Sequence, residues 1–399
     1  MLVRAVSILF LAILAHFLTR GLALLGILRS ISPSGVKTCQ RIQGPRLCED
    51  MTHGFEQGEY FLSCDASRLF HNTVMDTGFP QTKDDELLHG ELWSMQITKD
   101  GKHRVSKLDR GDEDLDFHPL GLAVDTQAKQ ILVANTPTLT KNASSIEVYS
   151  VQGPHLTLIK SIKSKYIHTP NSLYILPQAN MRSADGQLPS FIFTNDHFFV
   201  SGWKKVLENN LLLPLGSIGL YDARSDTVKP LLHGFSFANG VTGNTNGTVL
   251  YVAETYGQRI WKYRIVVPSG EGGIVELKKI ENVRVPMAVD NLSYQEETGD
   301  VIAAGHPIGY KLLKYASSND KSNLMLPPSM VLRWATNGSI SYIMTDDGST
   351  FGSSTTGILD SASGKLIVSG LFENDILMCD TDDYGKGSET DSTKQILTV

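Results

Sequence analysis

Four cysteines in 399 residues are too few for a scaffold held by disulfides, so the fold must rest on an apolar core. The chain also lacks an excess of basic residues, because 36 Lys and Arg stand against 42 Asp and Glu, and no basic stretch alternates with aromatics. Nucleic acid is therefore excluded as an expected partner. A hydrophobic fraction of 41% excludes a disordered chain, and 35 glycines are too many for a helical bundle.

The common catalytic motifs are missing as well. The sequence contains no HExxH or CxxC zinc pattern, no GxSxG nucleophile elbow and no phosphate-binding P-loop. Helical periodicity is equally scarce. Only the stretch from Trp203 to Leu211 places apolar residues at helical spacing. We expect one short helix there, inserted into a framework of sheets.

The remainder of the chain has the pattern of successive short strands. Runs rich in β-branched and aromatic residues recur, often with alternating polarity, and turn sequences such as Asn-Gly separate them. The runs are Gly58–Asp65, Glu91–Thr98, Gln130–Asn135, Ser145–Val151, Phe191–Asp196, Ser217–Arg224, Val249–Thr255, Arg259–Val266, Asp300–Pro307, Lys365–Phe372 and Asp375–Asp380. They predict an all-β fold, which is a large sandwich, a barrel or a propeller.

The cysteine positions favour a closed propeller among these. A bridge between Cys39 and Cys379 would join the first and last strands, as ring closure requires. It would close a loop of about 340 residues and, in the chain-entropy description, stabilise the fold by roughly 5 kcal/mol. Cys48 and Cys64 flank a Gly-rich segment, and they either face each other across a hairpin or remain buried thiols.

The N-terminus predicts entry into the secretory pathway. Arg4 precedes an apolar run over residues 5–19, and a second apolar stretch follows Arg20. This pattern is typical of an uncleaved signal-anchor, which we favour; a cleaved signal peptide or a buried helix are the alternatives. Sequons at Asn142, Asn246 and Asn337 agree with a glycoprotein that is membrane-anchored or secreted. The expected domains are a signal-anchor over residues 1–30, a linker over 31–38, the globular body over 39–380 and a polar tail over 381–399.

Polar residues gather where strands end, at Glu49-Asp50, Asn171-Ser172, Asn239-Gly240 and Asp290-Asn291. Each pair taken alone is typical of a turn or a solvated face. Taken together they supply carboxylate and amide oxygens, which are the hard ligands that calcium prefers.

Six short motifs stand in order between Cys39 and Cys379. They are Cys48-Glu49-Asp50, Phe117-His-Pro-Leu-Gly121, Thr194-Asn-Asp-His-Phe198, Gly234-Phe-Ser-Phe-Ala-Asn-Gly240, Val289-Asp-Asn-Leu-Ser293 and Gly305-His-Pro307. With these motifs the chain resembles the paraoxonase/arylesterase family, although the intervening sequence diverges. The resemblance implies a six-bladed β-propeller closed by a disulfide between Cys39 and Cys379, with an N-terminal hydrophobic helix. It also implies calcium-dependent lactonase or arylesterase activity.

The resemblance further implies a catalytic calcium ion. Its ligands would be Glu49, Asn171, Asn239, Asp290 and Asn291, and all five residue types are retained. Such an ion could polarise an ester or lactone carbonyl and stabilise the oxyanion. Asn291 stands in a sequon, yet we expect it to stay unglycosylated if it points at the metal.

A second, structural calcium is also implied, with Asp50, the Leu122 carbonyl and an acidic residue at position 172 as ligands. Position 172 is Ser in this chain, so one negative charge is missing. Because calcium affinity depends strongly on the charge of the ligands, we expect this site to be weakened or empty.

The family's histidine dyad falls on Leu120 and Thr136, and neither side chain can act as a general base. His118 lies two residues before Leu120, so in an extended segment both would project to the same face. We take His118 as a candidate base, with His306 and His197 as further candidates; the alternative is that His118 only forms a hydrogen bond at a blade edge. General-base help is typically worth about 10²–10⁴-fold, so losing the dyad would slow hydrolysis without abolishing it.

These observations predict a calcium-dependent hydrolase of small-molecule lactones or aryl esters, held at a membrane by its N-terminal segment. Two alternatives stay open. One is a catalytically silent propeller in which calcium braces the central tunnel and the pocket binds a ligand or partner. The other is a propeller with non-hydrolytic chemistry, such as strictosidine-synthase-like condensation, against which the five calcium-ligand types argue.

Overall fold

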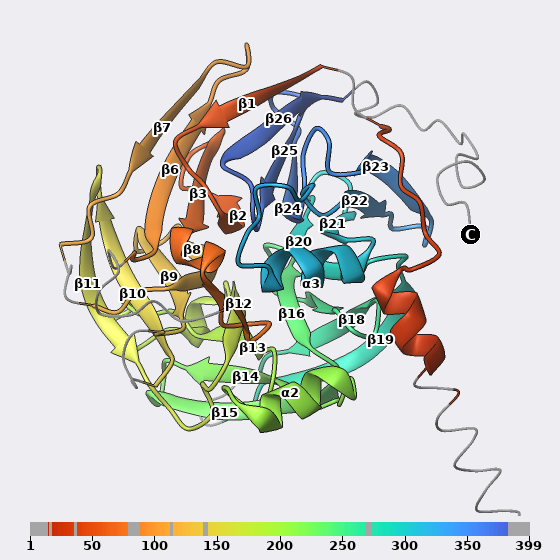
Figure 1. The fold of residues 1–399 in the computed structure, drawn as a ribbon. Helices are drawn as coiled ribbons and strands as arrows, with labels where there is room; N and C mark the ends of the chain where they lie inside the picture. The colour runs from red at the N-terminus through yellow and green to blue at the C-terminus, as the bar shows by residue number, and fades with distance from the viewer. Residues whose placement is uncertain are drawn as a thin grey trace, which may run out of the picture.

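The computed structural model describes residues 15, 18–35, 38–78, 88–111, 115–138, 143–268 and 273–381. Six four-stranded antiparallel sheets surround a central axis there as the blades of a β-propeller (Figure 1). The predicted all-β, six-bladed architecture is therefore confirmed. Most of the predicted polar tail, residues 382–399, lies outside the described residues.

Each blade is an antiparallel meander that begins with the strand nearest the axis. From the inside outward, the first blade contains β2 (Cys48–His53), β3 (Glu59–Cys64), β6 (Glu91–Ile97) and β7 (His103–Lys107). The second blade contains β8 (Pro119–Asp125), β9 (Gln130–Asn135), β10 (Ser145–Gln152) and β11 (His155–Ile162). The third blade contains β12 (Pro170–Ile175), β13 (Phe191–Asn195), β14 (Gly216–Asp222) and β15 (Thr227–Phe235). The next two are β16 (Ala238–Gly243), β17 (Val249–Glu254), β18 (Arg259–Val266) and β19 (Glu276–Arg284); β20 (Ala288–Tyr294), β21 (Val301–His306), β22 (Ser329–Trp334) and β23 (Ile340–Asp346).

The sixth blade closes the ring by combining both ends of the body. It contains β24 (Ser354–Asp360), β25 (Lys365–Gly370) and β26 (Asp375–Asp380), and its outermost strand is β1 (Cys39–Gln43). Cys39 lies opposite Cys379 in the register of β1 and β26, and the two form a disulfide. The predicted closure is confirmed. A second disulfide joins Cys48 to Cys64 at the paired ends of β2 and β3, which settles the choice left open above.

All six innermost strands begin with an irregularity in their pairing. In β2 the register passes from Cys48 to Asp50, so Glu49 has no partner opposite it; equivalent shifts open β8, β12, β16, β20 and β24. A β-bulge of this kind turns side chains away from the regular alternation of the strand. The bulges therefore determine which side chains face the axis at one end of the propeller.

Adjacent inner strands approach closely at these bulges, and glycine makes this possible. A Cβ atom on Gly121 would lie 2.4 Å from the Asn171 carbonyl oxygen, and one on Gly240 would lie 2.6 Å from the Asn291 Cα. No side chain fits in that space, so both positions require glycine. The core itself consists of apolar clusters between neighbouring blades, such as Leu132, Ile146 and Phe193 between the second and third blades.

Most helices lie at the end of the propeller axis where the inner strands begin (Figure 1). They are α2 (Trp203–Asn210), which confirms the predicted helix, α3 (Gly309–Ser317), the one-turn element η1 (Ala66–Leu69) and a short helix over residues 18–25. The one-turn element η2 (Ala179–Met181) follows β12 and lies at the opposite end. A two-stranded hairpin of β4 (His71–Asn72) and β5 (Thr77–Gly78) adjoins α3. Of the described helices, none is both long and apolar enough to cross a membrane.

Residues 18–35 pack against the propeller. Leu24 and Ile31 are buried among residues of the body, and Ser34 pairs with Thr345 through two backbone hydrogen bonds of 2.9 and 3.0 Å. The predicted signal-anchor of residues 1–30 lies partly outside the described residues, since only residue 15 and residues 18–30 are described.

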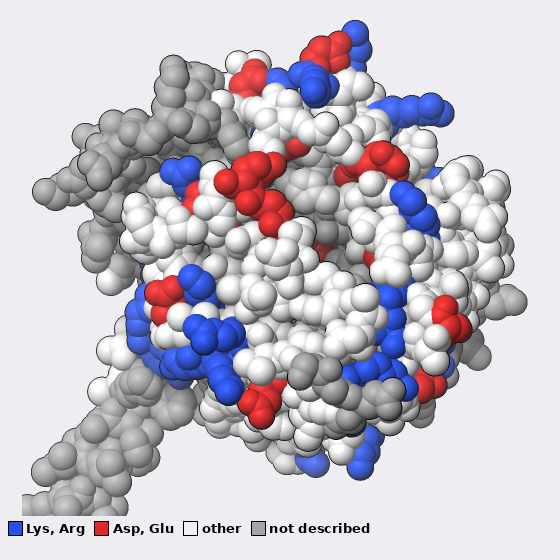
Figure 2. All heavy atoms as spheres, turned by 180° about the vertical axis from the view of Figure 1, so that it is seen from behind, with Lys and Arg blue, Asp and Glu red and all other residues white. Residues whose placement is uncertain are grey.

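Opposite faces of the propeller differ in character. At the end away from α2 and α3, a cavity of about 420 Å³ is lined by the second halves of the inner strands, with His53, Tyr174 and Tyr294 among them. Figure 2 shows the face seen from behind, where acidic side chains border a central hollow. The candidate site lies at the other end, where the inner strands begin.

Candidate functional site

The bulges bring the five predicted calcium ligands to the same end of the axis. Glu49 comes from the bulge of β2, Asn171 from that of β12 and Asn239 from that of β16, while Asp290 and Asn291 occupy the bulge of β20. All five side chains are buried, with exposed fractions of 7% or less. Residues separated by more than 240 positions in the chain meet here, because Asn291 Nδ2 donates to the Glu49 carbonyl oxygen at 3.0 Å and to Glu49 Oε1 at 3.1 Å.

The three amides are each held by their nitrogen. Asn291 Nδ2 is bound by Glu49, Asn239 Nδ2 donates to Thr255 Oγ1 at 3.1 Å, and Asn171 Nδ2 donates to Asp196 Oδ2 at 3.4 Å. Among the described residues, no hydrogen-bond partner exists for Oδ1 of these three amides or for Glu49 Oε2. Buried oxygens are normally paired, so four unpaired ones at a single end of the axis require an explanation.

A divalent cation would satisfy this donor set. Burial, followed by the negative charges of Asp290 and Asp50, raises the pKa of Glu49 well above its usual range. Two buried carboxylates and three amide oxygens are costly to leave without a positive charge, and calcium prefers such oxygens. Within the described residues, His, Cys, Asp and Glu alone form no group of three that could hold a metal. The asparagines are therefore essential to this donor set, and the residues present fit a calcium ion.

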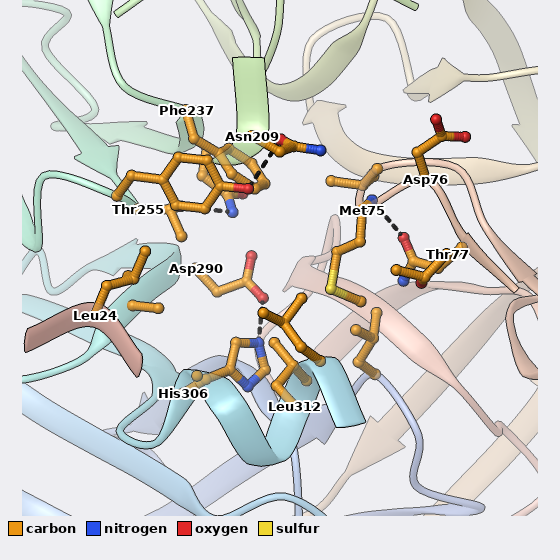
Figure 3. A pocket seen from close by; sticks show the side chains of 18 of the residues that line it. Leu24, Met75, Asp76, Thr77, Asn209, Phe237, Thr255, Asp290, His306 and Leu312 are labelled. Carbon is orange, nitrogen blue, oxygen red and sulfur yellow. Dashed lines mark hydrogen bonds and ion pairs between the residues drawn. The ribbon is translucent and has the colours of Figure 1, made fainter. Parts of the chain in front are cut away.

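A cavity of about 440 Å³ opens directly above these residues. Glu49, Asn171, Asn239 and Asp290 line it together with apolar side chains from several elements. The apolar part of the lining includes Leu24, Met75, Leu120, Leu212, Phe237 and Leu312. Figure 3 shows Asp290 directed into the cavity, with Leu24, Phe237 and Leu312 around it. A mostly apolar cavity with a few polar groups on its floor is the usual form of a small-molecule site.

His306 is the predicted histidine that reaches this cavity. It ends β21 and its Nε2 lies 3.1 Å from Asp290 Oδ2, while its buried Nδ1 has no partner among the described residues (Figure 3). His197 lies behind the floor, where its Nδ1 contacts Asp196 Oδ1 at 2.7 Å and its ring packs on Phe237. His197 thus supports Asn171 through Asp196.

The expectation that His118 shares a face with Leu120 is corrected. Leu120 lines the cavity, but among the described lining residues His118 is missing. The pairing of β8 with β9 passes from Pro119 to Leu122, so the bulge breaks the alternation on which the expectation depended. His118 is instead enclosed: its Nδ1 lies 2.9 Å from Asp65 Oδ2 and its Nε2 lies 3.1 Å from Asp116 Oδ1.

The residues predicted for the structural calcium are satisfied by the protein itself. Asp50 Oδ2 accepts a hydrogen bond from the Leu122 amide at 3.0 Å, and its Oδ1 accepts from the Met51 amide and the Thr356 hydroxyl. Burial raises the pKa of Asp50 to about 6 against these stabilising bonds. At Leu122 the amide, rather than the carbonyl, faces the carboxylate.

Sequence reasoning missed two contributors to the cavity. Arg68 lines it from η1, and its guanidinium donates to the carbonyl oxygens of Leu47 and Pro119, which precede β2 and the bulge of β8. An arginine in a Ser-Arg-Leu run carries no local signal. The N-terminal helix is the second contributor, since Gly21, Leu24 and Leu25 line the cavity. Its apolar composition was interpreted as part of an anchor.

Comparison with known proteins identifies a family for this chain. The arylesterase family model matches residues 82–381. The serum paraoxonase/lactonase 3 of Oryctolagus cuniculus is 26% identical over 353 residues, covering 87% of this chain and 90% of its own length. The serum paraoxonase/arylesterase 1 of Mus musculus is 25% identical over 367 residues, covering 89% and 92%. Regucalcin of Agrobacterium tumefaciens aligns with a TM-score of 0.46 and 15% identity, covering 88% of this chain and 94% of its own.

The family match includes the strands that carry four of the five predicted ligands and His306. Its members named above are described as paraoxonases, arylesterases or lactonases, which are hydrolases. With its six-bladed propeller and the ring of polar bulge residues on the axis, this chain belongs to the arylesterase family.

Proposed function

We propose that this protein is a calcium-dependent hydrolase of lactones or aryl esters. The observation that carries the proposal is the set of four buried oxygens, on Glu49, Asn171, Asn239 and Asn291, that lack a partner among the described residues. They lie beneath an apolar cavity of about 440 Å³ in a chain of the arylesterase family. Glu49, Asn171, Asn239, Asp290 and Asn291 would hold the ion, which supplies a Lewis acid for the substrate carbonyl.

The protein's own residues have two further tasks in this proposal. The apolar wall, which includes Leu120, Phe237 and Leu312, binds the hydrocarbon part of the substrate and excludes bulk water. His306 is the proton acceptor, because of the described histidines it alone lines the cavity and its Nδ1 has no partner there. Asp290, at 3.1 Å from Nε2, orients the imidazole.

The catalytically silent propeller is the second candidate. It is favoured by Leu120, which places a hydrocarbon side chain on the cavity wall where the family's dyad has a histidine. Such a protein would bind calcium and an apolar ligand without turnover.

A location in the secretory pathway, with glycans on exposed Asn246 and Asn337, remains a prediction, and Asn142 lies outside the described residues.

Turnover of phenyl acetate and of a δ-lactone, with calcium and then with chelator, tests the proposal. Glu49→Gln should abolish high-affinity calcium binding in calorimetric titration and reduce turnover to background. Glu56→Gln is the matched control, because it makes the same change on a side chain that is 78% exposed. Unchanged calcium affinity in Glu49→Gln refutes the metal site. Calcium binding by the parent without turnover of either substrate selects the silent propeller.

A further inference from the structure

The N-terminal segment of residues 18–35 forms one wall of the cavity. Leu24 is 8% exposed and packs with Leu212, Ala288 and Tyr256, and it lines the cavity together with Gly21 and Leu25. Ala288 stands two residues before Asp290 on β20. Figure 3 shows Leu24 on the same side of the cavity as Asp290 and His306. A substrate in this cavity would therefore contact the N-terminal helix.

Arg29 fixes this segment to the two loops that lead to the polar floor. Its Nη1 donates to the Pro286 carbonyl oxygen at 2.7 Å and to the Pro307 carbonyl oxygen at 3.1 Å. Pro286 precedes β20, which carries Asp290, and Pro307 directly follows His306. One guanidinium nitrogen thus ties together the loops next to the two strands that carry Asp290 and His306.

The backbone of the segment fits closely against the start of α3. Gly26 has a φ of +62°, and a Cβ atom there would lie 2.7 Å from the Pro307 carbonyl oxygen. A Cβ atom on Gly309 would lie 2.7 Å from the Leu24 carbonyl oxygen. Farther along, Ile31 joins the core cluster that contains Met287 and Ile308. These contacts hold the segment on both sides of Arg29.

We propose that residues 18–31 are a built-in wall of the substrate site, in which Leu24 determines specificity for the apolar part of the substrate and Arg29 positions Asp290 and His306. The specificity part rests on the proposed hydrolase function. The positioning part does not, because it concerns the protein's own loops. Deleting the segment would open the cavity to water on this side and release both loops.

Leu24 is tested with substrates of increasing chain length and with a ligand that cannot turn over. Leu24→Ala should lower kcat/KM for γ-lactones with long alkyl tails by about tenfold relative to the unsubstituted lactone, the usual effect of lost methylene contacts. Leu24→Phe should shift the preference toward short substrates. Leu22→Ala, on the same helix but 56% exposed, is the matched control.

Binding of a γ-lactam with an octyl tail, measured by calorimetry, gives a readout that does not depend on hydrolysis. Its affinity should fall in Leu24→Ala and stay unchanged in Leu22→Ala, with 2-pyrrolidinone as the tail-free reference. If lactam affinity falls in Leu24→Ala but the parent hydrolyses no lactone, the proposed function fails while the wall stands. Equal lactam affinity in the parent and in both Leu24 variants overturns the wall.

Arg29 is tested by Arg29→Met and by the conservative Arg29→Lys. Arg29 orients the proposed site without being one of its ligands, so the loss of Arg29 should weaken calcium binding by about 10–100-fold. It should lower kcat with little change in KM, and Arg29→Lys should restore part of both. Arg104→Met, on the exposed part of β7, is the control. If Arg29→Met lowers only the melting temperature and leaves calcium affinity and kcat unchanged, the positioning role is overturned.

Discussion

His118 offers the sharpest test of how this fold uses buried charge. Its imidazole is 2% exposed and lies between the carboxylates of Asp65 and Asp116, with the Ser67 and Thr138 hydroxyls at 3.0 and 2.8 Å. Burial lowers the pKa of His118, but the two carboxylates outweigh burial and raise it to about 9. The group is therefore an imidazolium at neutral pH, which disqualifies it as a general base there.

The pKa shift sets both the size and the sign of its contribution to stability. A rise from about 6.5 to about 9, at about 1.4 kcal/mol per pKa unit, corresponds to about 3 kcal/mol. Because the folded pKa lies above the unfolded one, the contribution is complete below pH 6.5 and is lost as the pH rises through 9. Removing one member of a buried ion pair costs about 3–5 kcal/mol, so His118→Ala should destabilise the fold by that order at pH 6.

Equilibrium urea unfolding at pH 6, 7.5 and 9.5, in the presence of calcium, measures this effect. The difference between the parent and His118→Ala should shrink toward pH 9.5. His155→Ala is the control, because His155 pairs with Asp109 at 3.1 Å on the surface, where its side chain is 68% exposed. A destabilisation that does not depend on pH refutes the reasoning. A second result would also refute it: a His118→Ala variant that is as stable as the parent but loses the acid limb of its pH–rate profile, because His118 would then be the general base.

Three other predictions concern the disulfide, the missing dyad and the glycans. Cys39→Ser should lower the free energy of unfolding by up to about 5 kcal/mol under oxidising conditions, and free thiols at Cys39 in a non-reducing peptide map of the parent would contradict this. Leu120→His should raise phenyl acetate turnover by up to about 100-fold. Thr136→His should add little, since of these two residues only Leu120 is among the described residues that line the cavity. If Leu120→His brings no gain in turnover, the silent propeller is supported. Expressed in a glycosylating host, the protein should carry no glycan on buried Asn291, in contrast to exposed Asn246, and glycopeptide mapping decides.

The alternation of polar and apolar residues predicted the all-β class of the fold, because successive side chains along a blade strand point to opposite faces of the sheet. The same rule failed at His118. Side chains separated by two positions share a face only while the pairing is regular, and the bulge between Pro119 and Leu122 interrupts it. Bulges depend on contacts between strands that are distant in sequence, such as the approach of Gly121 to Asn171, and no local pattern encodes them.

The N-terminal segment shows a second limit of composition. An apolar stretch flanked by arginines has the same composition whether it enters a membrane or packs on a protein. Over residues 18–35 the packing depends on contacts that composition does not encode, such as the hydrogen bonds of Arg29 to the carbonyl oxygens of Pro286 and Pro307, more than 250 residues away. The bridge between Cys48 and Cys64 was left open for a related reason, because spacing alone does not reveal whether two strands face each other.

The site separates two tasks that hydrolysis needs. The side chains suited to hold an ion come from inner strands of four different blades, and their positions follow from bulges that closure of the ring locks in place. Moving a proton would depend on single side chains, and at two such positions, where the family resemblance implies histidines, this chain has Leu120 and Thr136. A substitution at the rim leaves the bulges intact, whereas the loss of Glu49 would leave Asp290 and three amides without a common partner. The ion-holding part is therefore the more constrained of the two, and in the proposed hydrolase turnover would depend on His306.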